Sequence, residues 1–251
     1  RRGHAKSLLE DYSGAIADYT KAIELDANDS PSYYNRGKAK GNLEDYSGAI
    51  LDYTKAIEID PDDSDSYLDR GNAKSKLEDN DGAILDFTKA IEIDPDFSDA
   101  YFCRGYVKGE LNDHDGAISD YTKVIELDID FAVTSYYNRG IENFGLEKYI
   151  LAISDYTKVI ELDPDFVDAY FNRGLARYLS DDFYLALEDF TKVIEFSPNH
   201  AEAYYFRGRV KYELDDEFGA CFDAKKSQEL GYDCFDLIFS VCEWLFWIFL
   251  F

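Results

Sequence analysis

The chain has 251 residues, and 52 acidic residues against 26 Lys and Arg give it a formal net charge of −26. Its apolar content of 46% is enough to build a packed core, so the composition excludes global disorder. The charge excludes nonspecific binding to nucleic acid or to an anionic membrane surface, because both interactions require clustered basic residues. The sequence does not begin with Met, so we expect a fragment or a processed product.

An Arg-Gly pair recurs along most of the chain at intervals of 34 or 35 residues and marks seven units. The glycines of these pairs are Gly3, Gly37, Gly71, Gly105, Gly140, Gly174 and Gly208. An alanine stands twelve residues after each glycine, and an aromatic residue follows four positions later in all units except the last. Four units close with a proline, at Pro61, Pro95, Pro164 and Pro198. Self-similarity at this period is typical of a helical repeat array.

The apolar spacing within each unit predicts two helices. In the second unit we expect an opening helix from about Tyr33 to Leu43 and a second helix over 46–60 with one apolar face. Gly37 lies inside the opening helix, where glycine costs about 0.5–1 kcal/mol relative to alanine, so we expect a closely approaching partner helix there. Pro61 is expected to end the second helix. A single pair cannot bury its own apolar face, so neighbouring pairs must stack.

This pattern resembles the tetratricopeptide repeat family, in which each unit is a helix–turn–helix. The resemblance covers residues 1–234 and implies an all-α fold, a right-handed superhelical solenoid of such repeats. The expected units are 1–29 (partial), 30–63, 64–97, 98–131, 132–166, 167–200 and 201–234. The fit weakens at Ile129, where the family has proline, and Ala132 is interpreted as one inserted loop residue. The seventh unit departs from the pattern at Ala224, Ser227 and Tyr232.

Residues 235–251 break the repeat pattern. From Leu237 to Phe251, 13 of 15 positions are apolar. Three interpretations stay open: a helix that caps the last repeat, the truncated start of a membrane anchor, or a non-native end. A spanning helix needs about 20 apolar residues, so the segment is short for an anchor as it stands.

Two charged positions recur in every unit: the Arg before each glycine and an Asp sixteen residues after that Arg. In the third unit they are Arg70 and Asp86. The fixed spacing predicts an ion pair that joins the two helices of each unit, and the alternative is two unrelated solvent-facing charges. We favour the ion pair because the guanidinium fork matches a carboxylate.

No catalytic motif is found: the sequence has no phosphate loop, G-x-G-x-x-G, H-E-x-x-H or nucleophile elbow. We therefore expect no enzyme activity, no cofactor and no metal site. The acidic turns at 60–65 and 94–99 are interpreted as helix caps rather than calcium ligands. The four cysteines contain no C-x-x-C, and we expect them to be reduced structural thiols. They are Cys103, Cys221, Cys234 and Cys242.

The resemblance implies that the opening helices line a concave groove that holds a peptide or a partner helix. The expected groove residues are Tyr34, Asn35, Lys38, Leu68, Asn72, Phe102, Tyr106, Tyr137, Asn138, Ile141, Phe144, Phe171, Asn172, Leu175, Tyr178, Tyr205, Arg209 and Tyr212. The position four after each glycine changes from small residues, as in Gly41, to aromatic ones, as in Phe144 and Tyr178. This gradient predicts apolar anchors toward the C-terminal half, although the same side chains are equally well explained by packing.

The residue two before the glycine is Asn in three units, at Asn35, Asn138 and Asn172. An asparagine both donates and accepts, so such a ladder would clamp a peptide backbone without reading its sequence. The ladder is interrupted at Asp69, Cys103 and Phe206. The tyrosines one before the groove column are expected in the core between repeats. They are Tyr33, Tyr67, Tyr101, Tyr136, Tyr170 and Tyr204.

These features predict a protein–protein interaction scaffold that binds an extended peptide or a partner helix. Two alternatives stay open: a membrane-tethered assembly or trafficking factor, and the regulatory arm of a larger enzyme. We expect a protein or peptide partner of basic character with apolar anchors, because the net charge favours basic partners. No nucleic-acid partner is expected. The expected location is cytoplasmic, with membrane association only through 235–251.

Overall fold

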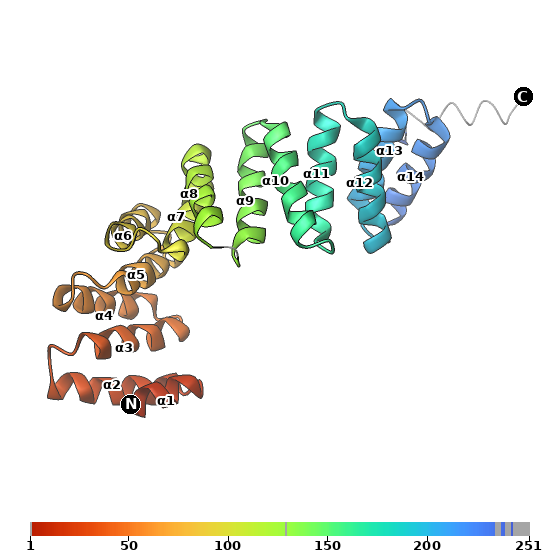
Figure 1. The fold of residues 1–251 in the computed structure, drawn as a ribbon. Coiled ribbons are helices and arrows are strands. Elements are labelled where there is room, and N and C mark those ends of the chain that lie inside the picture. The colour runs from red at the N-terminus through yellow and green to blue at the C-terminus, as the bar shows by residue number, and fades with distance from the viewer. Residues whose placement is uncertain (1, 129, 234–236, 239–241, 243–251) are drawn as a thin grey trace, which may run out of the picture. The chain divides into compact units, whose positions relative to one another are not determined.

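The structure is a computed structural model that describes residues 2–128, 130–233, 237–238 and 242. This described part contains fourteen α-helices and no strand, which confirms the predicted all-α class. The chain divides into two compact units, Arg1–Ile129 and Asp130–Phe251. In each of them, paired helices stack side by side as in a helical repeat solenoid (Figure 1).

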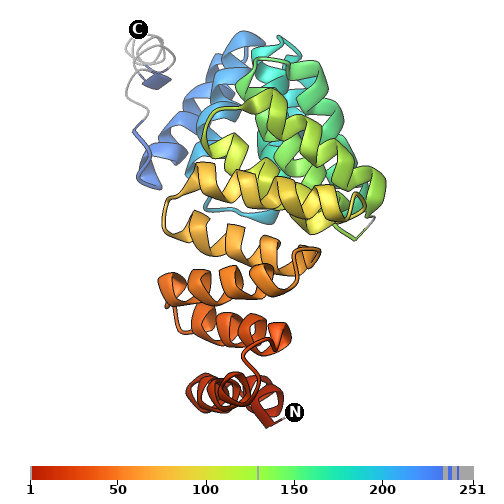
Figure 2. The ribbon, with the colours of Figure 1, turned by 90° about the vertical axis from the view of Figure 1, so that its left-hand side faces the viewer.

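The first unit contains α1 (Arg2–Leu8), α2 (Tyr12–Leu25), α3 (Ser30–Asn42), α4 (Tyr46–Ile59), α5 (Ser64–Lys76), α6 (Asn80–Ile93), α7 (Ser98–Glu110) and α8 (His114–Leu127). The second contains α9 (Ala132–Gly145), α10 (Tyr149–Leu162), α11 (Val167–Leu179), α12 (Phe183–Phe196), α13 (Ala201–Glu213) and α14 (Glu217–Glu229). We call the odd-numbered helices A helices and the even-numbered ones B helices. Within a unit, each A helix that stands between two B helices packs against both of them; Figure 2 shows the stack of the first unit, coloured red to yellow.

The turn from each A helix to its B helix is built in the same way. After α3, Glu44 adopts a left-handed backbone with φ of 61°, and its N–H donates to the carbonyl oxygen of Gly41. The N–H of Asp45 donates to the carbonyl oxygen of Lys40, which completes a Schellman motif. The left-handed residues of the seven turns are Glu10, Glu44, Glu78, Asn112, Glu147, Asp181 and Asp215.

The same turn also begins the B helix. The carboxylate of Asp45 accepts the N–H of Gly48 at 3.0 Å and so caps the first turn of α4. A Cβ at Gly48 would collide with that carboxylate, which explains why glycine occupies this position. In α12 a leucine, Leu185, takes the place of this glycine, and Asp182 makes no side-chain cap bond.

The B helices end where the sequence predicted, but proline is not required. Helix α4 ends at Ile59, before Pro61, and α2 ends at Leu25 with no proline behind it. In the acidic turn, Asp60 accepts the N–H of Asp62 at 3.3 Å, so this carboxylate serves the local backbone as a capping residue does.

Two sequence expectations need correction at the starts of A helices. Helix α3 begins at Ser30, three residues before the predicted Tyr33. Ala132 is not a loop residue: it is the first residue of α9 and is buried. The physical reason is that Phe131 already has helical backbone angles, so the inserted residue lengthens the helix. Ile129 lies outside the described residues.

In the first six repeats, the glycine of the A helix faces the aromatic ring of its B helix. A Cβ at Gly71 would lie 2.6 Å from the ring of Phe87, and one at Gly140 would lie 2.7 Å from Tyr156. Real Cβ atoms do not approach that closely, so the predicted close approach is confirmed. Glycine is required here because a Cβ would collide with the aromatic ring, and not with the backbone of the B helix.

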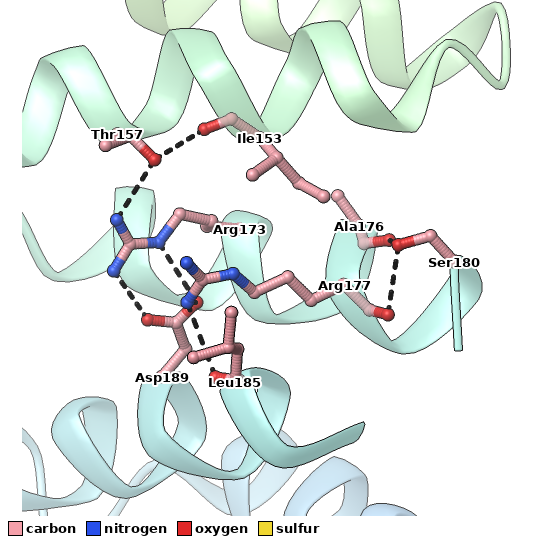
Figure 3. Close-up of polar contacts among 8 residues, drawn as sticks. All are labelled: Ile153, Thr157, Arg173, Ala176, Arg177, Ser180, Leu185 and Asp189. Carbon is pink, nitrogen blue, oxygen red and sulfur yellow. Dashed lines mark hydrogen bonds and ion pairs between the residues drawn. The ribbon is translucent and has the colours of Figure 1, made fainter. Parts of the chain in front are cut away.

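The predicted Arg–Asp ion pairs are present in all six repeats in which the side chains of both residues are described. Arg173 donates from Nε and NH2 to the two carboxylate oxygens of Asp189 at 3.1 and 2.7 Å (Figure 3). The other pairs are Arg36–Asp52, Arg70–Asp86, Arg104–Asp120, Arg139–Asp155 and Arg207–Asp223. The side chain of Arg2 lies outside the described residues.

The sequence prediction missed two further partners of these pairs. Arg177, four residues after Arg173, also binds the carboxylate of Asp189, with 2.7 Å between NH1 and Oδ2. Arg173 reaches the preceding B helix, where its NH1 donates to the hydroxyl of Thr157 at 3.1 Å. Thr157 donates its own hydroxyl hydrogen to the carbonyl oxygen of Ile153, which leaves a lone pair for the guanidinium. One arginine thus connects three helices.

The tyrosine expected between repeats instead lies under the arginine three residues later. The guanidinium of Arg70 lies 5.4 Å from the ring centre of Tyr67, a cation–π geometry. Five of the six tyrosines are only half-buried, and Tyr204 alone of this set reaches the core. The core expectation is therefore wrong for the other five.

The C-terminal segment corrects the expectation of four reduced cysteines. Cys221 of α14 and Cys242 form a disulfide with 5.2 Å between their Cα atoms, because the chain folds back onto α14. Cys103 agrees with the expectation: its thiol is free, and burial raises its pKa to about 12. Cys234 lies outside the described residues.

Leu237 fills a place that the seventh repeat leaves empty. Ala224 replaces the B-helix aromatic there, and a Leu237 methyl lies 3.2 Å from where a Cβ of Gly208 would stand. Leu237 and Cys242 are buried against α14, which is the contact that a capping segment makes. Most of the expected cap or anchor, 235–236, 239–241 and 243–251, lies outside the described residues. No helix of the described part is long and apolar enough to cross a membrane.

Candidate functional site

The A helices present one continuous surface in each unit. Helix α5 contacts α3 and α7, and α13 contacts α11, so neighbouring A helices lie side by side. We call the exposed side of these helices the A-helix face. All eighteen groove residues expected from the sequence lie on A helices, and none of them is buried.

In the first unit, the A-helix face combines exposed and packed side chains. Tyr106 is 53% exposed, and Lys38 is also exposed. Tyr34 and Phe102 lie against B-helix rings instead, with ring centres 5.9 Å from Tyr53 and 5.7 Å from Tyr121. The residues of the predicted groove here are Tyr34, Asn35, Lys38, Leu68, Asn72, Phe102 and Tyr106.

In the second unit, two of the three predicted aromatic anchors pack against other rings. Phe144 packs edge-on against Tyr149 of α10, and Tyr178 lies between Phe183 and Phe206. The third, Tyr212, is 41% exposed, and the predicted groove residue Ile141 is 42% exposed. The predicted groove residues of this unit are Tyr137, Asn138, Ile141, Phe144, Phe171, Asn172, Leu175, Tyr178, Tyr205, Arg209 and Tyr212.

The asparagine column is partly occupied within the protein. The side-chain amide of Asn35 donates to the carbonyl oxygen of Pro31 at 2.7 Å. Asn172 donates to the hydroxyl of Tyr137 on the preceding A helix at 3.0 Å. These two amides therefore help to hold the A helices and do not present all their hydrogen-bonding groups to a ligand.

An open pocket of about 220 Å³ lies between α3, α4 and α5 on the A-helix face. Its lining residues are Lys38, Gly41, Asn42, Tyr46, Ala49, Tyr53, Asp69, Asn72, Ala73 and Lys76. Gly41 has no side chain, so the space beside it stays free. A Cβ at this position would have only the Tyr53 hydroxyl within 4 Å, at 3.9 Å.

Asp69 is the chemically unusual residue of this pocket. Its Oδ2 is buried and has no hydrogen-bond partner within the protein, and the Tyr34 hydroxyl lies close to the same carboxyl group. Burial raises the pKa of Asp69, and the nearby Lys38 opposes this effect only in part. The sequence showed Asp69 only as a break in the asparagine column, because one more carboxylate carries no signal in so acidic a chain.

Family models for the tetratricopeptide repeat match residues 30–63, 52–84, 98–129 and 167–200, and a TPR repeat model matches 3–44, 71–111 and 144–181. The chain belongs to the tetratricopeptide repeat family. This confirms the resemblance drawn from the Arg-Gly, alanine and aromatic columns. Among the described residues, no group of three His, Cys, Asp or Glu side chains is placed to hold a metal ion.

Solved structures of other tetratricopeptide repeat proteins share the fold. A protein from Cytophaga hutchinsonii is 22% identical, with a TM-score of 0.81 over 95% of this chain and 97% of its own. YrrB, described as a TPR protein with an unusual peptide-binding site, is 24% identical, with a TM-score of 0.68 over 75% and 96%. MamA is 26% identical, with a TM-score of 0.64 over 69% and 94%. No curated protein sequence matches the chain significantly.

Proposed function

We propose that this tetratricopeptide repeat protein is a non-catalytic interaction scaffold that binds an extended segment of a partner protein on its A-helix face. The observation that carries the proposal is the set of exposed apolar side chains on the A helices, one or four residues after the glycine of the Arg-Gly pair. They are Tyr106, Ile141 and Tyr212. The Arg–Asp–Thr contacts hold the helices beneath them in place, and a preorganised surface loses little entropy on binding.

The partner segment is basic with apolar anchors. The net charge of −26 attracts a positively charged partner and speeds its association. Tyr106 and Tyr212 supply apolar area together with a hydroxyl, which suits contact with both side chains and backbone of a peptide.

Selection of random peptides displayed against the full chain tests the proposal. Replacing Ile141 or Tyr212 by serine should weaken binding of the selected peptides about tenfold, since each anchor side chain carries on the order of 1 kcal/mol or more. Tyr184→Ser is the matched control, because Tyr184 is 75% exposed on the B helix α12. Equal losses in all three variants, or no selected peptide at all, would contradict the proposal.

The disulfide bears on location. Disulfides persist in oxidising compartments and are rare in the cytosol, so the bond between Cys221 and Cys242 gives no support to the cytoplasmic location expected from the sequence.

A further inference from the structure

We propose that the pocket at Asp69 binds an arginine side chain of the partner segment. The inference rests on the proposed function for the position of that segment along the A-helix face. The pocket itself can be tested with a small ligand, so the two ideas can fail separately.

The carboxylate of Asp69 has an unpaired buried oxygen. Burying a carboxylate oxygen is costly unless it is paired. The Tyr34 hydroxyl lies close to this carboxyl group, but Oδ2 of Asp69 has no hydrogen-bond partner within the protein. Lys38 does not fill this position, since its ammonium lies over the Tyr34 ring, 5.3 Å from the ring centre. Oδ2 is shielded in the unliganded protein, so a cationic donor that enters the pocket supplies the missing partner once a side chain beside this oxygen shifts.

The shape and lining of the pocket suit a guanidinium group. Tyr46 and Tyr53 contribute aromatic rings, and Ala49 and Ala73 keep the walls small. A guanidinium is planar, weakly hydrated and stacks on aromatic rings while donating N–H groups, whereas an ammonium is compact and strongly hydrated. Lys38 and Lys76 are exposed, so both ammonium groups stay solvated at the rim.

The other repeats lack this combination of a glycine at the position of Gly41 and a carboxylate at the position of Asp69. Phe144 and Tyr178 occupy the position of Gly41 in later repeats, and Tyr178 packs against Phe206, 6.3 Å between ring centres. Phe206 stands in the column of Asp69, so rings fill the corresponding space there. Three repeats carry Asn in that column and adopt the same fold, which means that the fold does not require a carboxylate at this position.

The test is a titration of the isotope-labelled full chain with N-acetyl-arginine amide, followed by amide chemical shifts. The uncharged N-acetyl-citrulline amide is the matched ligand. We expect saturable shifts centred on Gly41, Asp69 and Asn72 with arginine and at least about tenfold weaker binding with citrulline, because a charge-assisted hydrogen bond is lost.

Two variants address the pocket and one controls for charge. Asp69→Asn removes the charge with a residue that other repeats carry, and Gly41→Phe fills the pocket with the residue of the fifth repeat. Both should weaken arginine binding at least about tenfold. Asp81→Asn, at an exposed position of α6, changes the net charge equally and should have no effect. If Gly41→Phe fails to fold, Asp69→Asn alone decides.

Shifts spread over the acidic surface, or arginine binding unchanged by Asp69→Asn, would overturn the arginine pocket. Peptide selection that succeeds while this titration fails would leave the proposed function intact. Arginine binding without any selected peptide would support the arginine pocket and contradict the proposed function.

Discussion

At the residue scale, Asp69 should lower the stability of the unliganded protein. Its pKa is higher in the folded chain than the ordinary 3.8, so the folded state binds its proton more tightly than the unfolded state. Stability therefore falls as the pH rises from below 3.8, and the loss is complete once the pH is above the raised pKa of the folded state. Asp69→Asn should melt at a higher temperature than the native chain at neutral pH, and the difference should close in acid. An Asn variant that melts lower at neutral pH would contradict this.

A second residue-scale prediction concerns the caps of the B helices. Asp79 accepts the N–H of Gly82 at 3.1 Å, so Asp79→Ala should lower the free energy of unfolding by about 1 kcal/mol. Asp182 stands at the same position of α12 but makes no side-chain cap bond, so Asp182→Ala should cost clearly less. Urea unfolding of both variants measures the difference. Equal losses would show that charge near the helix dipole, and not the cap bond, is what matters.

At the element scale, the carboxylate between the two helices of a repeat is the most sensitive group. Asp86 binds Arg70 at 2.7 Å and Lys74 at 2.8 Å, and it is buried. Asp86→Asn leaves two cations without their counter-charge, so we expect a loss of about 3–5 kcal/mol in urea unfolding. Thr54→Val removes only the acceptor of one Arg70 hydrogen bond and should cost about 1 kcal/mol. Similar losses in the two variants would refute this ranking.

The same contacts predict the effect of exchanging Arg70 and Asp86, which keeps one positive and one negative charge in the pair. Lys74 also contacts this carboxylate, so an arginine at position 86 would face a second cation. The exchanged variant should therefore be less stable than the native chain.

The contacts between the helices of a repeat could be predicted from the sequence, because the residues that make them recur in each repeat. Seven copies of Arg-Gly, with Asp at fixed spacing, were enough to predict the ion pair and the close approach at Gly71. Features that occur once were not predictable. The bond between Cys221 and Cys242 depends on how the chain folds back after α14, and the pocket at Asp69 depends on Gly41 in another helix.

At the scale of the whole molecule, the end of the array depends on one covalent link. The disulfide closes a loop between residues 21 apart, for which the chain-entropy model gives about 3 kcal/mol. Reduction, or Cys242→Ser, should therefore release the Leu237 contact and lower the melting temperature. Thiol titration of the denatured chain should show two fewer thiols without reductant than with it. Equal thiol counts would contradict the disulfide.

In the proposed function, a partner segment binds the A helices and not the B helices. The B helices are a real competitor, since Leu51 on α4 is 72% exposed and Tyr184 on α12 is 75% exposed. The most direct measurement is a crystal structure of the full chain with a selected peptide. We predict an extended peptide against A-helix residues such as Tyr106 or Tyr212. A peptide seated on Leu51 or Tyr184, with the A-helix face empty, would contradict the account.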